Sequence, residues 1–296
     1  MRESSFVRLP STEIHVVDSG GSGTPQVLVH GLGGNHTNWI EVFDPLAARG
    51  RTVAMDLPGY GYSPPVEVRD LDTLASVLIE LLETLVRPAI LIGNSMGGLL
   101  AEIVASTRPD MVADLILIAP AGPPASLRHR PDNGVAVRLA AQSFPGLGNV
   151  VAGAYRRLLT PQQLAQMRLE IVAAEPSLLP ERVRTASFAM AARRADMPWA
   201  TRALVESTVS MRRMFIPPRR HRRMIASIGH EALVLSGDRD ILVAPETIDA
   251  LETLRPDWTV RRLEGIGHVP QLERADWVLE EIDRWLTRHE QEARAT

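Results

Sequence analysis

Cysteine and lysine are both absent from the sequence, and all 32 basic residues are arginine. A chain without thiols has no disulfide framework, no thiolate metal site and no cysteine nucleophile. A chain without a lysine amine cannot use Schiff-base chemistry, a Ser–Lys dyad or a phosphate-binding P-loop. Much of covalent enzyme chemistry is therefore excluded before any motif is considered.

Long apolar runs and a strong net charge are missing as well. No run approaches the roughly 18 apolar residues of a membrane-spanning helix, and residues 1–10 lack the apolar core of a signal peptide. We therefore expect a cytoplasmic protein. The net charge of −3 favours neither nucleic acid nor a membrane surface as a partner. The content of 45% hydrophobic residues excludes a disordered chain and is sufficient for a large core.

Short apolar runs rich in β-branched residues recur along the chain and predict strands that are buried on both faces. They cover residues 27–29, 53–55, 90–92, 115–118, 233–235 and 258–263. Helical patterns lie between several of them, at residues 71–86, from Ser95 to about Thr107, after Pro245 and after Gln271. This alternation predicts a doubly wound, mostly parallel α/β sheet. Residues 6–9 and 13–18 are expected to form a leading hairpin.

One interval between predicted strands is far longer than the others. Residues 121–230 show a pattern of short helices interrupted by prolines. These prolines are Pro131, Pro145, Pro161, Pro176, Pro180, Pro198, Pro217 and Pro218. A helical insert after a central strand of a parallel sheet indicates a lid. The expected segments are a first core part at 1–121, a helical lid at 122–229 and a second core part at 230–296.

The strongest chemical signal is Gly93-Asn94-Ser95-Met96-Gly97, between a predicted strand and a predicted helix. A sharp strand-to-helix turn exposes the serine hydroxyl, and its crowded backbone tolerates only small residues two positions to either side. The amide after the serine then lies at a helix N-terminus, which favours negative charge. Ser95 is therefore the predicted nucleophile.

A serine hydroxyl needs a base, and His268 has the most suitable setting among the eight histidines. It lies between the last predicted strand and the last helix, at the same sheet edge as Ser95. The acid that orients this imidazole is expected after the preceding strand, where Asp238 and Asp240 compete. Asp240 is preferred because it lies further into the loop, whereas Asp238 suits a turn-forming role. His30 is expected to pack beneath its own loop.

Residues 30–34, with the sequence HGLGG, follow the first strand of the predicted parallel sheet. Glycine allows a backbone to approach a ligand closely, so we expect Gly31 and Gly33 to line the substrate site. The N–H groups of Leu32 and Met96 are the predicted donors to an oxyanion. A dinucleotide site is rejected, because the loop lacks the GxGxxG spacing and no acidic residue follows about 20 positions on.

Taken together, these motifs resemble those of the α/β-hydrolase superfamily. The order Ser95, Asp240, His268 matches the Ser–Asp–His order of that fold. The segment 56–63, DLPGYGYS, resembles a structural loop of the superfamily, so Asp56 is not expected to be the acid of the site. The resemblance covers residues 5–122 and 230–288. It implies an α/β-hydrolase fold with a serine nucleophile, because branches of the superfamily that use an aspartate nucleophile are excluded.

The motif around Ser95 also resembles the C–C bond hydrolases of aromatic degradation, although Val269 stands where that branch carries a tryptophan. This resemblance implies a lid arginine that binds a substrate carboxylate, with Arg168 or Arg193 in that role. Val269, directly after His268, is expected to line the substrate site.

The expected activity is hydrolysis of small-molecule carboxylic esters with an apolar acyl or alcohol part, through an acyl-enzyme and without a metal or organic cofactor. The alternative enzyme is a C–C bond hydrolase of ring-fission dienoates, and a ligand receptor of the same fold is the non-catalytic alternative. The sequence leaves the oligomeric state open.

Two features of the predicted lid have more than one interpretation. Its apolar side chains fit either an apolar substrate or packing of the lid helices. They are Met167, Met190, Met197, Met211, Met214 and Phe215. Six arginines between residues 212 and 223 fit either a solvated lid face or a site for an anionic substrate or lipid headgroup.

Overall fold

The computed structural model describes residues 3–85, 88–123, 144 and 147–295. Within them, one sheet contains β1 (Glu3–Arg8), β2 (Glu13–Asp18), β3 (Gln26–Val29), β4 (Thr52–Met55), β5 (Ala89–Asn94), β6 (Val112–Ile118), β7 (Ala232–Gly237) and β8 (Thr259–Leu263). The strand order is β1-β2-β4-β3-β5-β6-β7-β8. β1 and β2 form the expected hairpin, β2 pairs antiparallel with β4, and all other neighbours are parallel. The predicted mostly parallel α/β sheet is confirmed.

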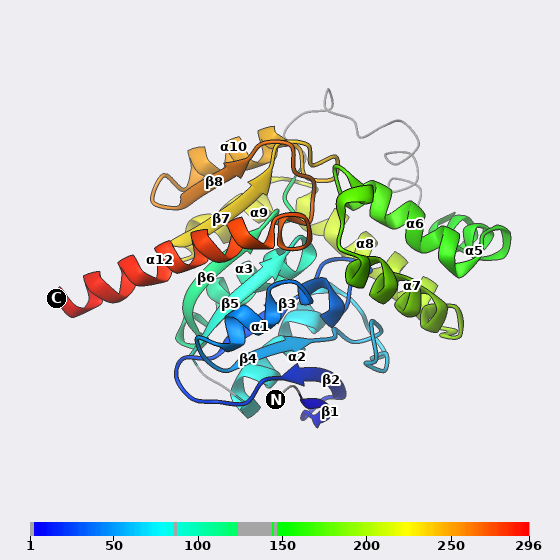
Figure 1. Ribbon diagram of the computed structural model, residues 1–296, viewed down its shortest axis with the longest axis horizontal. Coiled ribbons are helices and arrows are strands. Elements are labelled where there is room, and N and C mark those ends of the chain that lie inside the picture. Colours follow the sequence, from blue (N-terminus) through cyan, green and yellow to red (C-terminus); the bar gives the residue numbers. More distant parts are fainter. Residues whose placement is uncertain (1–2, 86–87, 124–143, 145–146, 296) are drawn as a thin grey trace.

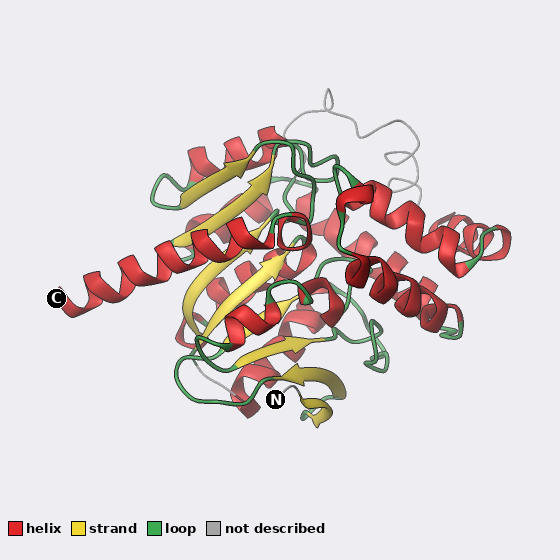
Figure 2. Cartoon of the chain, in the orientation of Figure 1, coloured by secondary structure: helices red, strands yellow, loops and turns green. Residues whose placement is uncertain are grey.

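Helices cover both faces of this sheet (Figures 1 and 2). The helices of the described residues are α1 (Phe43–Ala47), α2 (Leu71–Leu85), α3 (Met96–Thr107), α5 (Leu147–Leu158), α6 (Pro161–Val172), α7 (Glu181–Ala195), α8 (Ala200–Phe215), α9 (Arg219–Ser227), α10 (Pro245–Leu254), α11 (Pro270–Glu273) and α12 (Ala275–Ala295), with the short 3₁₀ helices η1 (His36–Trp39), η2 (Pro109–Met111) and η3 (Pro176–Leu178). Successive strand residues point to opposite faces. In β3, Val27 and Val29 join an apolar cluster with α2, α3, α9 and α10, whereas Leu28 joins one with α1 and α12. Two-sided burial explains why these strands are apolar at every position.

Two predicted elements differ from the structure. The run at 258–263 contains β8, but Arg261 and Arg262 are exposed because β8 forms an edge of the sheet. The single helix expected after Gln271 is divided into α11 and α12, because Arg274 between them has φ −143° and ψ 64°, outside the helical range. Among the described residues, no helix combines the length and apolarity needed to cross a bilayer.

The insert between β6 and β7 forms helices α5 to α9, and these helices (residues 147–227) are called the cap below (Figure 1). Pro161 is the first residue of α6, and Pro180 and Pro218 directly precede α7 and α9. Proline is common at helix starts, because a backbone N–H at these positions would have no intrahelical acceptor and its absence costs no hydrogen bond. Phe215 and Ile225 join the main apolar cluster, so the end of the cap is anchored to the core. His129, Pro131 and Pro145 lie outside the described residues.

Candidate active site

Four loops leave the carboxyl edge of the sheet near one another. β3 has β4 on one side and β5 on the other, and Val29 pairs with Gly93. The loops after β3 and β5 therefore begin side by side, at the point where the strand order reverses direction. Ligands of open α/β sheets bind at such points. The loops after β7 and β8 leave the same edge, because these strands continue the parallel pairing.

Ser95 lies on a sharp turn between β5 and α3, with φ 56° and ψ −118°. This left-handed φ is strained for a residue with a side chain. A Cβ at Gly93 would lie 2.4 Å from the carbonyl oxygen of Gly97, and a Cβ at Gly97 would lie 2.0 Å from that of Val29. The predicted requirement for glycine at both positions is therefore explained by backbone contacts. Within the described residues, the Ser95 hydroxyl forms no hydrogen bond.

The glycine loop at residues 30–34 lies against this turn. A Cβ at Gly31 would come within 2.9 Å of the Ser95 Cβ. In the described part of the chain, the amide N–H groups of Leu32 and Met96 donate no hydrogen bond. The amide of Met96 also opens α3, where the helix dipole favours negative charge. The two segments that meet at the serine thus each carry an unbonded N–H donor, as an oxyanion site requires.

The structure brings Asp240 to His268 and leaves Asp238 apart. Nδ1 of His268 lies 2.7 Å from Oδ2 of Asp240, and both side chains are buried. The other oxygen of Asp240 accepts two backbone N–H groups, at 2.8 and 2.9 Å, so the carboxylate is held facing the imidazole. Asp238 is exposed and accepts the N–H of Gly265 at 2.6 Å. It therefore connects two loops, whereas the sequence predicted that it would bond its own turn.

Asn94 connects the turn at Ser95 to the loop that carries His268, which is called the histidine loop below. The side-chain NH₂ of Asn94 donates to the carbonyl oxygens of Ile118 and His268, at 3.0 and 3.2 Å. The residue before the serine thus holds the backbone of the histidine. No hydrogen bond joins the Ser95 hydroxyl to the imidazole among the described residues. Such contacts often shorten only when substrate is bound.

The cap is also hydrogen-bonded to the histidine loop, both directly and through the side chain of Glu273. The N–H of His268 donates to the carbonyl of Val172 at 2.7 Å. Glu273 accepts the N–H groups of Ala174 at 2.8 Å and Gly267 at 3.0 Å. Burial raises the pKa of Glu273, and the nearby charge of Asp240 raises it further. The attachments made by Asn94 and Glu273 were not predicted, because both depend on segments distant in the sequence.

Two cap arginines lie on the glycine loop. Arg194 donates from Nη2 to the carbonyl of Gly33 at 2.9 Å, and Arg168 donates from Nη1 to the same oxygen at 3.3 Å. Nη1 of Arg194 is buried and has no hydrogen-bond partner among the described residues. Burial lowers the pKa of Arg194, but a guanidinium stays protonated near neutral pH. Arg193 lies instead over the ring of Tyr62, 4.0 Å from its centroid. Arg194 was not predicted.

Val269 lies where the core meets the cap. Its side chain is 2% exposed and packs in an apolar cluster with Leu169 and Val183 of the cap. Met214 and Phe215 belong to the main apolar cluster, so these two lid residues contribute to packing.

Asp56 is buried and holds together the loop that it opens, in agreement with its expected structural role. Its carboxylate accepts the N–H groups of His36 and Tyr62 at 2.6 and 2.8 Å, and the Nδ1 atoms of His15 and His36 approach within 2.8 to 3.1 Å. Burial alone would raise the pKa of Asp56, but the hydrogen bonds of the two imidazoles lower it below the usual range. In the described chain, the possible metal-ligand atoms of His15, His36 and Asp56 lie within 4.8 Å of one another, but all three already serve this network.

His30 packs beneath the glycine loop, as its position after β3 predicts. Its Nδ1 bonds the carbonyl of Gly31 at 2.8 Å, and its Nε2 accepts the N–H of Leu57 at 3.0 Å. Burial lowers the pKa of His30 to about 4. The free imidazole titrates near 6.5, so unfolding between these pH values takes up a proton. The free energy of unfolding therefore falls as the pH drops through this window.

We expect the titration of His30 to lower the free energy of unfolding by about 3 kcal/mol as the pH falls from 7 to 4. The variant His30→Gln is neutral throughout. It should be less stable at pH 7 because it loses a fitted hydrogen-bonding ring, but its stability should fall less towards pH 4. Urea unfolding of both proteins at several pH values measures the difference in slope. Parallel profiles would mean that His30 ionises alike in the folded and unfolded chain.

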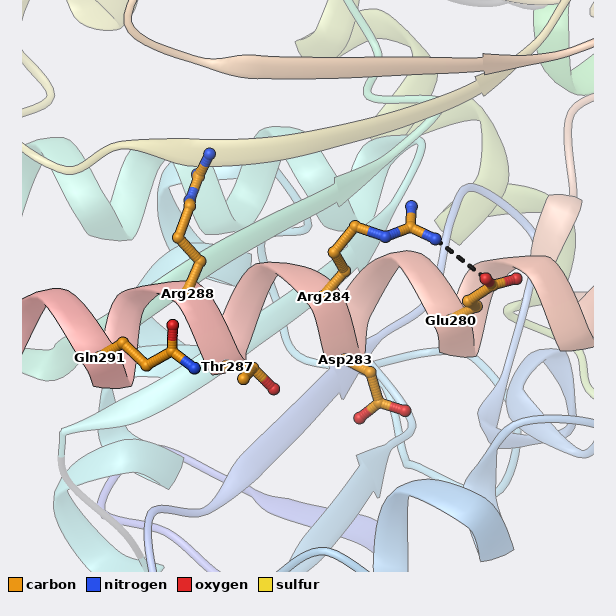
Figure 3. Close-up of a pocket in the computed structure, with 6 residues that line it drawn as sticks. All are labelled: Glu280, Asp283, Arg284, Thr287, Arg288 and Gln291. Atoms are coloured by element: carbon orange, nitrogen blue, oxygen red, sulfur yellow. Dashed lines mark hydrogen bonds and ion pairs between the residues drawn. The ribbon is translucent and has the colours of Figure 1, made fainter.

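A shallow depression of about 380 Å³ runs along one side of α12 (Figure 3). All its lining residues belong to this helix, and Arg284 pairs there with Glu280 at 2.9 Å. None of them comes from the loops that carry Ser95, Asp240 or His268. This depression is therefore not a candidate active site.

Residues 26–281 match the sequence profile of the alpha/beta hydrolase family. The chain belongs to the α/β hydrolase family. This α/β hydrolase is 32% identical over 272 residues to the dihydrolipoyllysine-residue acetyltransferase component of the acetoin cleaving system of Pseudomonas putida, across 91% of the chain and 65% of that relative. The chain thus spans less than two thirds of that protein.

Two further relatives are named as esterases. The pimeloyl-[acyl-carrier protein] methyl ester esterase of Methylococcus capsulatus is 27% identical to this hydrolase, across 86% of the chain and 92% of the relative. A thermophilic esterase from Thermogutta terrifontis has a similar structure, with a TM-score of 0.73 and 23% identity across 97% of this chain and 98% of that chain. The family and fold implied by the sequence motifs are therefore confirmed.

Proposed function

We propose that this α/β hydrolase cleaves carboxylic esters through an acyl-enzyme, with Ser95 as nucleophile, His268 as base and Asp240 as the orienting acid. His268 takes the hydroxyl proton as the serine oxygen attacks the ester carbonyl. The N–H groups of Leu32 and Met96 stabilise the tetrahedral oxyanion. The imidazolium then protonates the leaving alcohol, and water hydrolyses the acyl-enzyme by the same route. This route requires no metal or organic cofactor.

The observation that carries this proposal is the 2.7 Å contact between Asp240 and Nδ1 of His268. An imidazole that donates from Nδ1 to a carboxylate presents a basic Nε2, which is the atom that must accept the serine proton. The strained turn at Ser95 and the unbonded amides beside it support the same assignment.

A fluorophosphonate probe tests the nucleophile directly, because it reacts only with an activated hydroxyl. We expect intact-mass analysis to show one adduct per chain and peptide mapping to place it on Ser95. The variant His268→Ala should react far more slowly. An adduct on another residue, or an active enzyme that forms no adduct, would contradict the proposal.

We propose that an apolar acyl or alcohol group binds beside Gly31, Gly33 and Val269, beneath a lid formed by residues 122–229. A panel of aryl esters of increasing acyl length, measured beside a ring-fission dienoate, separates the ester hydrolase from the C–C bond hydrolase. Faster turnover of the dienoate than of every ester would favour the alternative enzyme. Stoichiometric binding without turnover would indicate a receptor.

One observation favours a second candidate, in which the substrate of the same site carries an anionic group. Arg168 and Arg194 meet at the carbonyl of Gly33, and Nη1 of Arg194 is unsatisfied within the described residues. Gly31 lies beside the serine, since a Cβ there would come within 2.9 Å of the Ser95 Cβ, and two peptide units span at most about 7 Å. An anion a few carbon atoms from the scissile carbonyl can therefore reach this pair. A ring-fission dienoate or a dicarboxylic half-ester has such a group.

Arg194→Gln tests this candidate. If the arginine binds the anion, KM for a half-ester should rise about 10- to 100-fold, because a hydrogen bond to a charged group is lost. KM for the matching neutral diester should change little. Arg193→Gln is the matched control, since it removes the adjacent guanidinium that lies over Tyr62. Equal effects of Arg194→Gln on both substrates would reduce its role to holding the glycine loop.

A further inference from the structure

The helix α9 presents an unusual concentration of positive charge at the surface of the cap. Its sequence, RRHRRMIAS, contains four arginines and no acidic residue. Arg219, Arg220, Arg222 and Arg223 are exposed, as is Arg213 near the end of α8. We call these five residues the arginine face. The whole chain carries a net charge of −3, so this face opposes the overall charge of the protein.

The positive charges of the arginine face reduce the stability of α9 itself. No acidic residue lies in the first turn, where the helix dipole favours negative charge, and Arg219 and Arg220 place two positive charges there. Arg219 and Arg223 are also four residues apart, and like charges at this spacing destabilise a helix. An external anion would relieve both effects.

Few carboxylates of the described residues neutralise the arginine face. Arg220 lies 3.8 Å from Asp72, with both side chains more than half exposed. In the described part of the chain, the other four arginines of the face form no ion pair with a carboxylate. Two exposed arginines on the core, Arg274 and Arg284, differ in this respect, since each bonds a neighbouring carboxylate.

The orientation of α9 is fixed by its opposite side. His221 and Ile225 are buried, and Nε2 of His221 lies 3.3 Å from the buried carboxylate of Glu102 on α3. Residues one helical turn apart share a face, so these anchors prevent α9 from turning its arginines inward.

Apolar side chains are exposed beside the arginine face. Ile216, in the connection between α8 and α9, is 64% exposed, and the prolines that follow it are exposed too. Phe144 is 49% exposed and lies under the guanidinium of Arg212, which precedes Ile216 by one turn of α8. Exposed apolar groups flanked by arginines are typical of segments that lie in a membrane interface, where the arginines bind lipid phosphates and the apolar groups enter the acyl boundary.

We propose that the arginine face, together with Ile216, docks the protein on the surface of an anionic lipid bilayer. Charge complementarity favours a phosphate-rich surface, and the exposed isoleucine favours a bilayer over a soluble polyanion, which has no apolar layer to receive it. The proposal concerns reversible attachment at the surface and is independent of the proposed ester hydrolysis.

Co-sedimentation with vesicles tests this proposal. The purified protein should bind vesicles of equal parts phosphatidylglycerol and phosphatidylcholine at low salt, bind them much less in 0.5 M NaCl, and not bind pure phosphatidylcholine vesicles. Each arginine near an anionic surface contributes about a fivefold factor, so R219Q/R222Q/R223Q should weaken binding about a hundredfold. Ile216→Ser should weaken it about tenfold, through the lost apolar contact.

The matched control removes the same charge from arginines elsewhere on the protein. R108Q/R274Q/R284Q changes three side chains that pair with carboxylates on the core, and it should bind vesicles like the natural protein. Thermal unfolding followed by circular dichroism checks that both triple variants are folded. Equal losses in the two triple variants would indicate a general charge effect and overturn the proposal. Absence of vesicle binding would overturn it too, as would equally tight binding to heparin that Ile216→Ser leaves unchanged.

Discussion

Replacing Ser95 with alanine is expected to lower kcat for ester hydrolysis by about four orders of magnitude or more, while the protein stays folded. The expected loss is large because nucleophile, base and acid act as a unit, so removal of the nucleophile leaves only the binding and oxyanion contributions. The fold should persist, because the hydroxyl forms no hydrogen bond within the described residues and the backbone bond from Ser95 to Ile118 remains. Initial rates with an aryl ester and thermal unfolding of the same samples measure the two effects.

Ser106→Ala is the control for this experiment. Ser106 lies near the end of α3, and among the residues that the structure describes its hydroxyl bonds only the carbonyl of Ile103, at 2.9 Å. Its removal should leave kcat within about twofold of the natural value, since it lies outside the site. Rapid ester hydrolysis by a folded Ser95→Ala protein would refute the assignment of the nucleophile.

Replacing Asp240 with asparagine is expected to lower kcat by about 10³- to 10⁴-fold. The amide keeps the size of the carboxylate but can donate to Nδ1 of His268, which favours the tautomer with its proton on Nε2. The imidazole then cannot accept the serine proton, and the imidazolium loses its neighbouring negative charge. The measurement is kcat against pH for the natural protein and the variant.

Asp238→Asn is the matched control, because the two aspartates share one loop. Asp238 is exposed and bonds the N–H of Gly265, so its variant should retain activity within a few fold and lose at most about 1 kcal/mol of stability. The opposite ranking, with Asp238→Asn inactive and Asp240→Asn active, would require the acid to be reassigned.

The central residues of the candidate site could be proposed from the sequence because they lie within short, ordered motifs. Ser95 is identified by glycines two positions to either side, and the structure explains both by contacts with backbone atoms. Asp240 could be chosen over Asp238 by its position further along the loop, and the structure places its carboxylate against His268. Parallel strands also place their following loops at one edge, so the prediction of a parallel sheet was sufficient to place these segments at the same edge.

The contacts made by the cap could not be predicted. Prolines marked several helix starts, but no local pattern states which side of a cap helix faces the core. Arg193 and Arg194 are adjacent and chemically identical, yet one lies over Tyr62 and the other bonds the carbonyl of Gly33. The edge position of β8 was missed for the same reason, since strand order depends on pairing between segments distant in the sequence.

The attachment of the cap to the histidine loop restricts how substrate can enter. The backbone at residues 172–174 approaches Gly267 so closely that a Cβ there would lie 2.7 Å from the nitrogen of Ala174, and His268 donates its own N–H to Val172. A hinge motion that lifted this end of the cap would either break these contacts or, if they held, carry the imidazole away from the serine. If His268 is the base, as proposed, substrate must therefore enter away from this attachment, or the enzyme is inactive while the attachment is open and recovers its base only when it closes.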